Sequence, residues 1–193
     1  MTDISSQKKR MRAAANIRRA EAFALHGATA SEKLASRGLA FLAPSASAAI
    51  SGFSAIGDEI DPLPLLLRLA NDGHLLALPA MQGKGKPLLF RTWTPGDEMA
   101  PAVWGIAEPL SSRPPVLPDI VLVPLLVFDP SGHRLGYGGG FYDRSLHELR
   151  RQKRVIAVGI AYDEQCLDAV PHLDYDQPLD WVLTPSGPIK CSR

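Results

Sequence analysis

Hydrophobic residues in this chain follow two patterns: some recur at helical spacing, and others form short continuous apolar runs. The alanine-rich start predicts a helix over residues 5–26 that ends at Gly27. Thr29 and Glu32 have the spacing of a capping box, which predicts a second helix over residues 29–41. Two further helices are predicted over residues 62–72 and 143–152.

The apolar runs predict buried strands. The strongest run, residues 119–129, is apolar on both faces, which is typical of a central strand. Further strands are predicted over residues 49–56, 74–80, 87–93, 154–163 and 179–185. The proline-rich residues 94–118 are expected to form a loop, and residues 186–193 a loose tail.

Strands that alternate with helices predict an α/β fold. We expect a three-layer sandwich in which helices flank a mostly parallel central sheet and residues 5–41 form an N-terminal helical arm. The length of 193 residues and the hydrophobic fraction of 46% suit a single domain over residues 1–193.

Charge and composition narrow the expected partners to small molecules. Lys and Arg number 21 and Asp and Glu 20, which argues against a nucleic-acid partner. No apolar run reaches about 18 residues, so no membrane partner is expected. The distant Cys166 and Cys191 form no disulfide framework, so we expect a cytoplasmic protein. The basic start also suits a transit peptide. We expect the protein to be a monomer.

A glycine-rich segment follows the strongest predicted strand. Gly136, Gly138, Gly139 and Gly140 lie just before the predicted helix that begins at Asp143. Glycine backbone amides and a helix N-terminus suit a phosphate group, although a flexible connector has the same composition. Neither the Walker pattern nor the dinucleotide-binding pattern is present. Asp143 suits either a helix cap or a magnesium ligand beside the phosphate.

The run from Pro124 to Asp143, PLLVFDPSGHRLGYGGGFYD, resembles the signature of the 5-formyltetrahydrofolate cyclo-ligase family, also called methenyltetrahydrofolate synthetase. Other segments that resemble the family are Lys8 with Arg12, Gly57 to Ile60, Leu78-Pro79, Trp104 to Pro109 and Asp180 to Thr184. The chain departs from the family pattern at Phe141, at Tyr175-Asp176 and over residues 44–54.

The resemblance implies a reaction in which 5-formyltetrahydrofolate and ATP become 5,10-methenyltetrahydrofolate, ADP and phosphate, with Mg²⁺. ATP would phosphorylate the formyl oxygen, and N10 would then attack the activated carbon. A non-catalytic folate- or nucleotide-binding protein, a sugar-phosphate isomerase and an acyl transferase are the alternatives. The joint presence of Lys8, Arg12, Arg134, Asp143 and Asp180 favours the enzyme.

The same resemblance implies roles for single residues. The implied ATP-binding residues are Lys8, Arg12, Arg134, Leu135, Gly136, Tyr137, Gly138, Gly139, Gly140, Phe141 and Tyr142. The implied folate-binding residues are Ser54, Glu59, Tyr137, Gly138, Gly139, Gly140 and Phe141. Arg134 and Tyr142 are the implied catalytic residues, and Asp143 and Asp180 the implied magnesium ligands. Simpler interpretations are a solvated basic face for Lys8 and Arg12, a core role for Phe141, and turn acids for Glu59 and Asp180.

Overall fold

The computed structural model describes residues 3–102 and 105–192. Its helices are α1 (Ile4–Arg37), η1 (Ala40–Leu42), α2 (Leu63–Asn71), α3 (Phe141–Gln152) and η3 (Asp163–Gln165). Its strands are β1 (Ala49–Ser51), β2 (Leu75–Met81), β3 (Leu88–Thr92), β4 (Met99–Pro101), β5 (Ala107–Pro109), β6 (Ile120–Pro124), β7 (Val127–Phe128), β8 (Arg134–Leu135), β9 (Ile156–Ile160), β10 (Trp181–Thr184) and β11 (Gly187–Lys190). Within the described ranges, no helix is long and apolar enough to cross a membrane.

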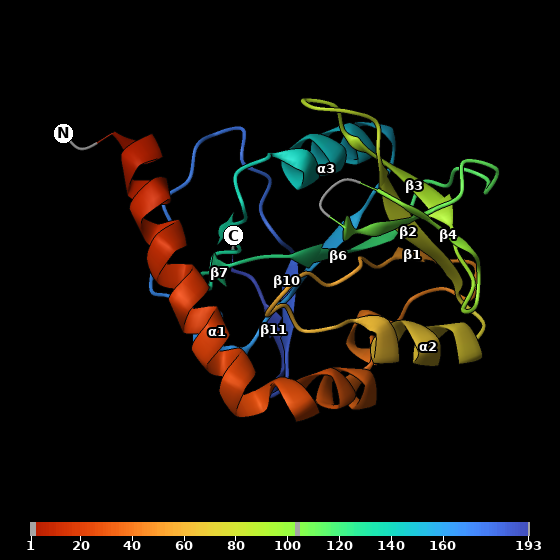
Figure 1. Ribbon diagram of the computed structural model, residues 1–193, viewed down its shortest axis with the longest axis horizontal. Helices are drawn as coiled ribbons and strands as arrows, with labels where there is room; N and C mark the ends of the chain where they lie inside the picture. The colour runs from red at the N-terminus through yellow and green to blue at the C-terminus, as the bar shows by residue number, and fades with distance from the viewer. Residues whose placement is uncertain (1–2, 103–104, 193) are drawn as a thin grey trace.

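Seven strands form the main sheet in the order β11-β10-β9-β6-β1-β2-β3. The five inner strands pair in parallel, while β11 and β3 pair antiparallel at the two edges. The prediction of a mostly parallel central sheet is confirmed. The helices α1 and α2 cover one face and α3 covers the other, as Figure 1 shows, which confirms the expected three layers.

Two apolar clusters hold these layers together. Leu34 of α1 and Leu65 of α2 pack with Ile50, Leu122 and Val158 of the sheet. On the opposite face, α3 packs on the sheet through Leu146 and Leu149. The central strands β6 and β9 are therefore buried on both faces, as their continuous apolar runs predict.

The direction of the chain reverses between β1 and β6, which are neighbours in the sheet. From β1 the chain continues through α2 to β2, whereas from β6 it continues through α3 to β9 on the other side. The segments that leave the carboxyl ends of β1 and β6 thus diverge. Ligands of open α/β sheets bind where such segments part, and this region is called the crevice below.

The prediction of two N-terminal helices separated at Gly27 is wrong, because α1 is continuous from Ile4 to Arg37. Gly27 lies inside the helix, where the ring of Phe23 packs so closely that an added Cβ would lie 2.9 Å from its Cδ2. Ala30 and Leu34 beyond it are fully buried. This packing outweighs the cost of about 1 kcal/mol that glycine imposes on a helix.

Four predicted strand or loop segments also differ from the structure. The run over residues 119–129 is two strands, because the chain leaves the main sheet after Pro124 and β7 pairs with β8 instead. The tail over residues 186–193 is not loose, since β11 pairs along the edge of β10. The predicted loop over residues 94–118 contains a short hairpin of β4 and β5. The predicted strand over residues 49–56 ends at Ser51.

Candidate functional site

The glycine segment connects β8 to the first turn of α3. Gly138 and Gly140 have φ values of 99° and 65°, which favour glycine, and Gly140 is the residue that precedes α3. Asp143 lies in the first turn of this helix, where its negative charge complements the helix dipole. The loop therefore presents backbone to one side of the N-terminus of α3, as a phosphate-binding loop requires.

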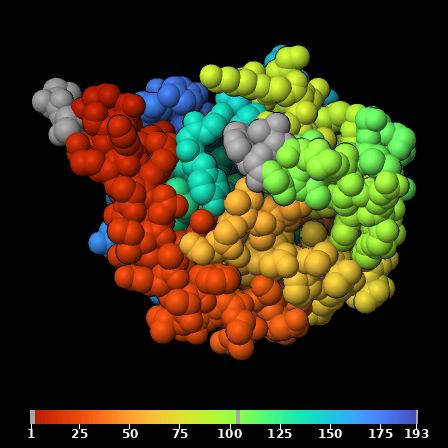
Figure 2. Space-filling model, viewed as in Figure 1, coloured from red at the N-terminus to blue at the C-terminus, as the bar shows by residue number. Residues whose placement is uncertain are grey.

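The N-terminal half of α1 lies beside this loop. Arg12 donates a hydrogen bond from Nε to the carbonyl of Gly136 over 2.8 Å. A Cβ added at Gly138 would lie 3.3 Å from Arg12 Cζ. Figure 2 shows the corresponding arrangement, in which the teal segment that contains the loop lies between red α1 and the orange segment after β1.

Lys8 and Arg134 bring two more cations to the same region. Lys8 Nζ forms an ion pair with Asp176, and both side chains are largely buried. Arg134 donates to Asp143 Oδ1 from Nη2 over 2.8 Å, and from Nη1 to the carbonyl of Gln177. The amide of Gln177 donates to Asp143 Oδ1 over 3.0 Å. The segment that contains Asp176 and Gln177 therefore ties Lys8, Arg134 and Asp143 into one network.

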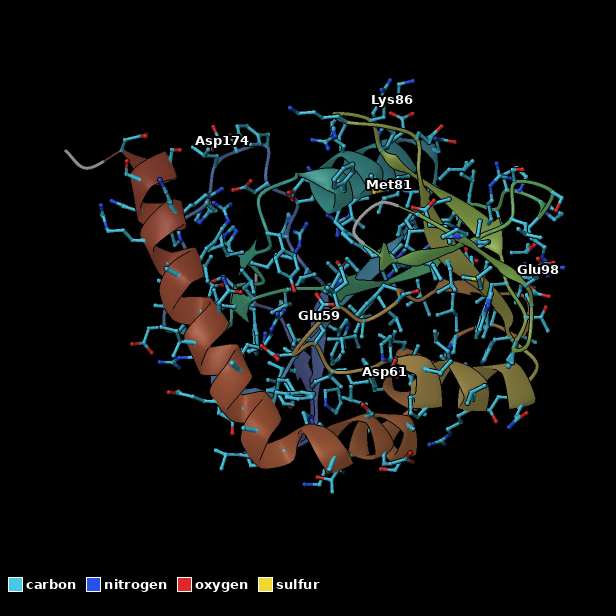
Figure 3. The ribbon with its side chains drawn as sticks, in the orientation of Figure 1. Glu59, Asp61, Met81, Lys86, Glu98 and Asp174 are labelled. Atoms are coloured by element: carbon cyan, nitrogen blue, oxygen red, sulfur yellow. The ribbon has the colours of Figure 1, made fainter. Side chains whose placement is uncertain are left out.

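Glu59 lies on the other side of the crevice, after β1. Its side chain is 4% exposed, and Figure 3 shows the residue between α1 and the central sheet. Oε2 accepts a hydrogen bond from the amide of Ile56 over 2.9 Å. Oε1 accepts one from the hydroxyl of Tyr137 over 2.8 Å. Tyr137 belongs to the glycine loop, so this bond joins the two segments that diverge from β1 and β6.

Arg19 is the cation of this second group. Its Nη1 lies 3.6 Å from Glu59 Oε1 and donates a hydrogen bond to the hydroxyl of Tyr137. The guanidinium also lies 5.4 Å from the centre of the Tyr137 ring. Arg19 Nε is buried and has no hydrogen-bond partner among the residues that the structure describes. Arg19, Glu59 and Tyr137 are called the carboxylate cluster below.

Burial controls the protonation of this cluster. Loss of water contact raises the pKa of Glu59, against the opposing effects of the Ile56 amide, the Tyr137 hydroxyl and Arg19. Burial, reinforced by the charge of Glu59, raises the pKa of Tyr137 to about 12. Burial also raises the pKa of Tyr142, and the charge of Glu59 adds to the effect. Both tyrosines are therefore neutral at physiological pH.

The two predicted magnesium ligands are held by different arginines. Asp180 Oδ2 accepts hydrogen bonds from Arg150 over 3.0 Å and from the amide of Ala157 over 2.8 Å. Asp180 immediately precedes β10, so it lies at the amino ends of the parallel strands. Asp143 lies at the start of α3, which follows the carboxyl end of β6. Arg150 also donates a hydrogen bond to Gln177 Oε1 over 3.2 Å, so Gln177 links the two carboxylates indirectly although they lie at opposite ends of the parallel strands.

Asp143 has an oxygen that could bind a magnesium ion beside a phosphate. Its carboxylate is 28% exposed, and Oδ2 accepts no hydrogen bond from any described residue. Mg²⁺ binds readily to one carboxylate together with phosphate oxygens and waters. Within residues 3–102 and 105–192, no group of three or more His, Cys, Asp or Glu side chains could hold a metal by itself. The site therefore suits Mg²⁺ that arrives with a nucleotide.

The other predicted residues lie around the same crevice. Phe141 packs against Gly139 and under the guanidinium of Arg144. Tyr142 packs against the apolar cluster between α3 and the sheet, which contains Leu146 and Leu149. Ser54 donates to the carbonyl of Ala107 over 3.3 Å. Leu135 is buried beneath the loop, so its side chain serves packing. Trp104 lies outside the described residues.

Arg19 is the residue of this site that sequence reasoning left without a role. Its spacing from Lys8 and Arg12 places all three on nearly one side of α1, because a helix turns once in 3.6 residues. That spacing was a usable signal for a shared face. It could not identify Glu59 as the partner, since the two residues are 40 positions apart in the sequence.

Comparison with known proteins agrees with this geometry. Residues 4–185 match the model of the 5-formyltetrahydrofolate cyclo-ligase family.

The chain belongs to this family. It is 36% identical to 5-formyltetrahydrofolate cyclo-ligase of Escherichia coli K12 over 142 residues, which cover 71% of this chain and 78% of the relative. It is 35% identical to the Mycolicibacterium smegmatis enzyme of the same name over 188 residues, 92% of this chain and 88% of the relative.

Solved structures of family members share the fold. The Aquifex aeolicus 5,10-methenyltetrahydrofolate synthetase has a TM-score of 0.71 at 24% identity, with 93% of each chain covered. The Mycoplasma pneumoniae enzyme of the same name has a TM-score of 0.65 at 21% identity, with 89% of this chain and 98% of the other covered. The three-layer architecture is therefore that of the cyclo-ligase family.

Proposed function

We propose that this protein converts 5-formyltetrahydrofolate and ATP to 5,10-methenyltetrahydrofolate, ADP and phosphate. One observation carries the proposal. The segments that diverge from β1 and β6 meet through the hydrogen bond between Glu59 and Tyr137, which brings the carboxylate that we assign to folate beside the loop that we assign to phosphate. The family membership of the chain supports the same reaction.

The cations and the glycine loop hold the triphosphate of ATP. Arg12 is already in contact with the loop backbone, and Lys8 lies in the same region through its ion pair with Asp176. Phosphate oxygens would replace the contacts that these side chains make within the protein. The backbone amides from Gly136 to Gly140 and the N-terminus of α3 add donors that require no side-chain movement.

Asp143 holds Mg²⁺ together with the phosphates of ATP, through the carboxylate oxygen that accepts no hydrogen bond from the described residues. Bound in this way, the ion neutralises charge that develops during phosphoryl transfer. Arg134 stays beside Asp143 and directs its guanidinium charge at the transferring group. Asp180 remains a candidate second acid only if Arg150 releases it.

Glu59 binds the pterin ring of the folate, because ring N–H groups donate to a carboxylate. Tyr142 and Phe141 form the wall of the space in which the formyl group meets the phosphate, and Tyr137 lies beside both substrates.

The formamide oxygen is a poor leaving group as hydroxide. Its phosphorylation by ATP turns it into a good leaving group, so N10 can attack the formyl carbon and displace phosphate. Alignment of the two substrates is the main task of these residues.

The protein is expected to act as a cytoplasmic monomer on small molecules, with no nucleic-acid or membrane partner. The nearly balanced charge supports this expectation.

A direct assay tests the proposed activity. Purified protein is mixed with Mg²⁺, ATP and 5-formyltetrahydrofolate, and the ultraviolet absorbance of the methenyl product is followed. We expect a product signal that requires ATP and disappears when a chelator removes the metal. Binding of both substrates with no product would instead support the non-catalytic alternative.

A further inference from the structure

The carboxylate cluster contains an ion pair that is almost wholly removed from water. The Arg19 and Glu59 side chains are 6% and 4% exposed. Charges buried to this degree lose several kcal/mol of hydration, which mutual attraction recovers only with good hydrogen bonding. Nothing in the fold requires a charged pair here, because apolar side chains of similar volume would fill the space between α1 and the sheet. The pair therefore calls for a functional explanation.

Arg19 also has an unused donor. Its Nη1 is engaged by Tyr137 and lies close to Glu59, but its Nε is buried without a partner among the described residues. An unsatisfied buried donor costs about 1–3 kcal/mol. Such groups in folded proteins commonly belong to binding or catalytic sites.

Arg19 is one of three groups that favour the charged form of Glu59. Burial is the strongest influence on this carboxyl and raises its pKa, whereas the Ile56 amide, the Tyr137 hydroxyl and the charge of Arg19 lower it. Of these three groups, Arg19 is the one that carries a positive charge.

The phenols that face the cluster are Tyr137 from the glycine loop, Tyr142 from α3 and Tyr162 from the segment after β9, and burial raises the pKa of all three. The charges of Arg134, Asp58 and Glu164 also act on these phenols. Glu59 is the buried carboxyl of this group, and its raised pKa means that it takes up a proton at a higher pH than an exposed glutamate does.

We propose that Arg19 is a positioning residue that holds the Glu59 carboxylate charged and oriented for the pterin ring, an inference that rests on the proposed function. Tyr137 completes the arrangement, since its hydroxyl donates a hydrogen bond to Glu59 Oε1. When a pterin N–H takes that oxygen, Arg19 remains beside it and keeps the charge. Arg19 thus acts on folate through Glu59, from a helix that also carries the phosphate-binding Lys8 and Arg12.

The sign of the pH dependence follows from the carboxyl chemistry. Glu59 accepts from pterin N–H groups when ionised, so folate affinity falls as the pH drops through the pKa of Glu59. Removing Arg19 removes an influence that lowers this pKa. The loss of affinity then begins at a higher pH in an Arg19 variant, with a slope of at most about tenfold per pH unit for one proton.

The test measures the dissociation constant of 5-formyltetrahydrofolate by calorimetry without ATP across the whole pH range in which the fold is intact. We expect Arg19→Met to bind more weakly than the unaltered protein at the acidic end of this range and to approach it at the alkaline end, while Arg19→Lys retains most of the original profile. Methionine fits the buried volume, and near-ultraviolet circular dichroism checks the fold. Arg18→Met is the matched control, because exposed Arg18 lies on the same helix and instead contacts the Glu164 carbonyl. Its pH profile should not change.

A second measurement needs no ligand. The carboxyl titration of Glu59 is followed by carbon-13 NMR of the free protein and assigned with Glu59→Gln. Its midpoint should rise in Arg19→Met and stay unchanged in Arg18→Met. An unshifted midpoint, or weaker folate binding by the same factor at every pH, would overturn the inference. If the unaltered protein fails to bind 5-formyltetrahydrofolate at all, the proposed function fails and the NMR titration still reports whether Arg19 controls Glu59.

Discussion

Asp143 and Asp180 illustrate how contacts separate residues that look alike in the sequence. Each carboxylate pairs with one arginine and accepts a hydrogen bond from one backbone amide. Asp143, however, lies at the N-terminus of α3 beside the glycine loop, whereas Asp180 lies at the amino end of β10. We therefore assign the nucleotide-bound metal of the proposed function to Asp143, whereas Asp180 holds the last turn of α3 to the sheet.

The variants Asp143→Asn and Asp180→Asn form a matched pair. Asparagine can keep the bond to the backbone amide in both, and each variant loses one ion pair. Asp180→Asn should lose about 1 kcal/mol of stability, a fall of about 2–4 °C in Tm for a chain of this size. Asp143→Asn should lose more, because its partner Arg134 is 6% exposed whereas Arg150 is 21% exposed. We expect only Asp143→Asn to lower kcat/KM for Mg-ATP, by about 10²-fold or more, as expected for the loss of charge stabilisation in phosphoryl transfer.

Steady-state kinetics over a range of Mg²⁺ concentrations, with calorimetry for Tm, measures both effects. Equal losses of activity in the two variants would contradict the assignment of the metal to Asp143.

The glycine loop and α1 are in direct contact. The loop offers backbone rather than side chains, and Arg12 reaches it from the helix through the Gly136 carbonyl. Gly138 has a φ of 99° and leaves room for the Arg12 guanidinium. Gly136 has neither constraint, since an added Cβ would meet no described atom within 4 Å. Close contact with α1 therefore explains glycine at position 138 but not at position 136.

Replacement of Gly138 and Gly136 by alanine should show whether the backbone conformation and the close contact with Arg12 require glycine. Gly138→Ala places a side chain at a positive φ, which costs about 1–2 kcal/mol, and displaces Arg12. We expect a lower Tm and a higher KM for ATP. Gly136→Ala is the control and should leave Tm unchanged and alter the KM less. Thermal unfolding and ATP titration measure both, and an unchanged KM in Gly138→Ala would show that Arg12 does not depend on the loop.

Much of the sheet could be predicted from the sequence, because strands buried on both faces carry continuous apolar runs. The runs that contain β6 and β9 identify the two central strands in this way. Local rules failed where tertiary contacts outweigh them. Gly27 has the composition of a helix end, yet the packing of Phe23 and the burial of Ala30 keep α1 continuous.

The candidate site shows the same division. The cations, the glycine loop and Glu59 carry recognisable motifs, so they were expected to take part. Which cation pairs with which carboxylate depends on the folded chain: Arg134 forms an ion pair with Asp143, and Arg150 forms one with Asp180. The link from Arg19 to Glu59 likewise exists only after α1 docks against the segment that follows β1.

In the proposed function, the two substrates meet at the reversal between β1 and β6. The strand β1 leads to Glu59, which we assign to folate, while β6 leads to the glycine loop, which we assign to the phosphates. The long helix α1 spans both, with Lys8 and Arg12 at the loop and Arg19 at Glu59. The fold therefore favours direct contact between the terminal phosphate of ATP and the formyl oxygen of the folate.

Oxygen-18 in the formyl group tests this contact directly. The labelled substrate is turned over with Mg-ATP in unlabelled water, and mass spectrometry locates the label in the products. Phosphorylation of the formyl oxygen predicts one labelled oxygen in each inorganic phosphate released and none in water. Label that appears in water, or product that forms without ADP, would contradict transfer of the phosphoryl group to the formyl oxygen at this site.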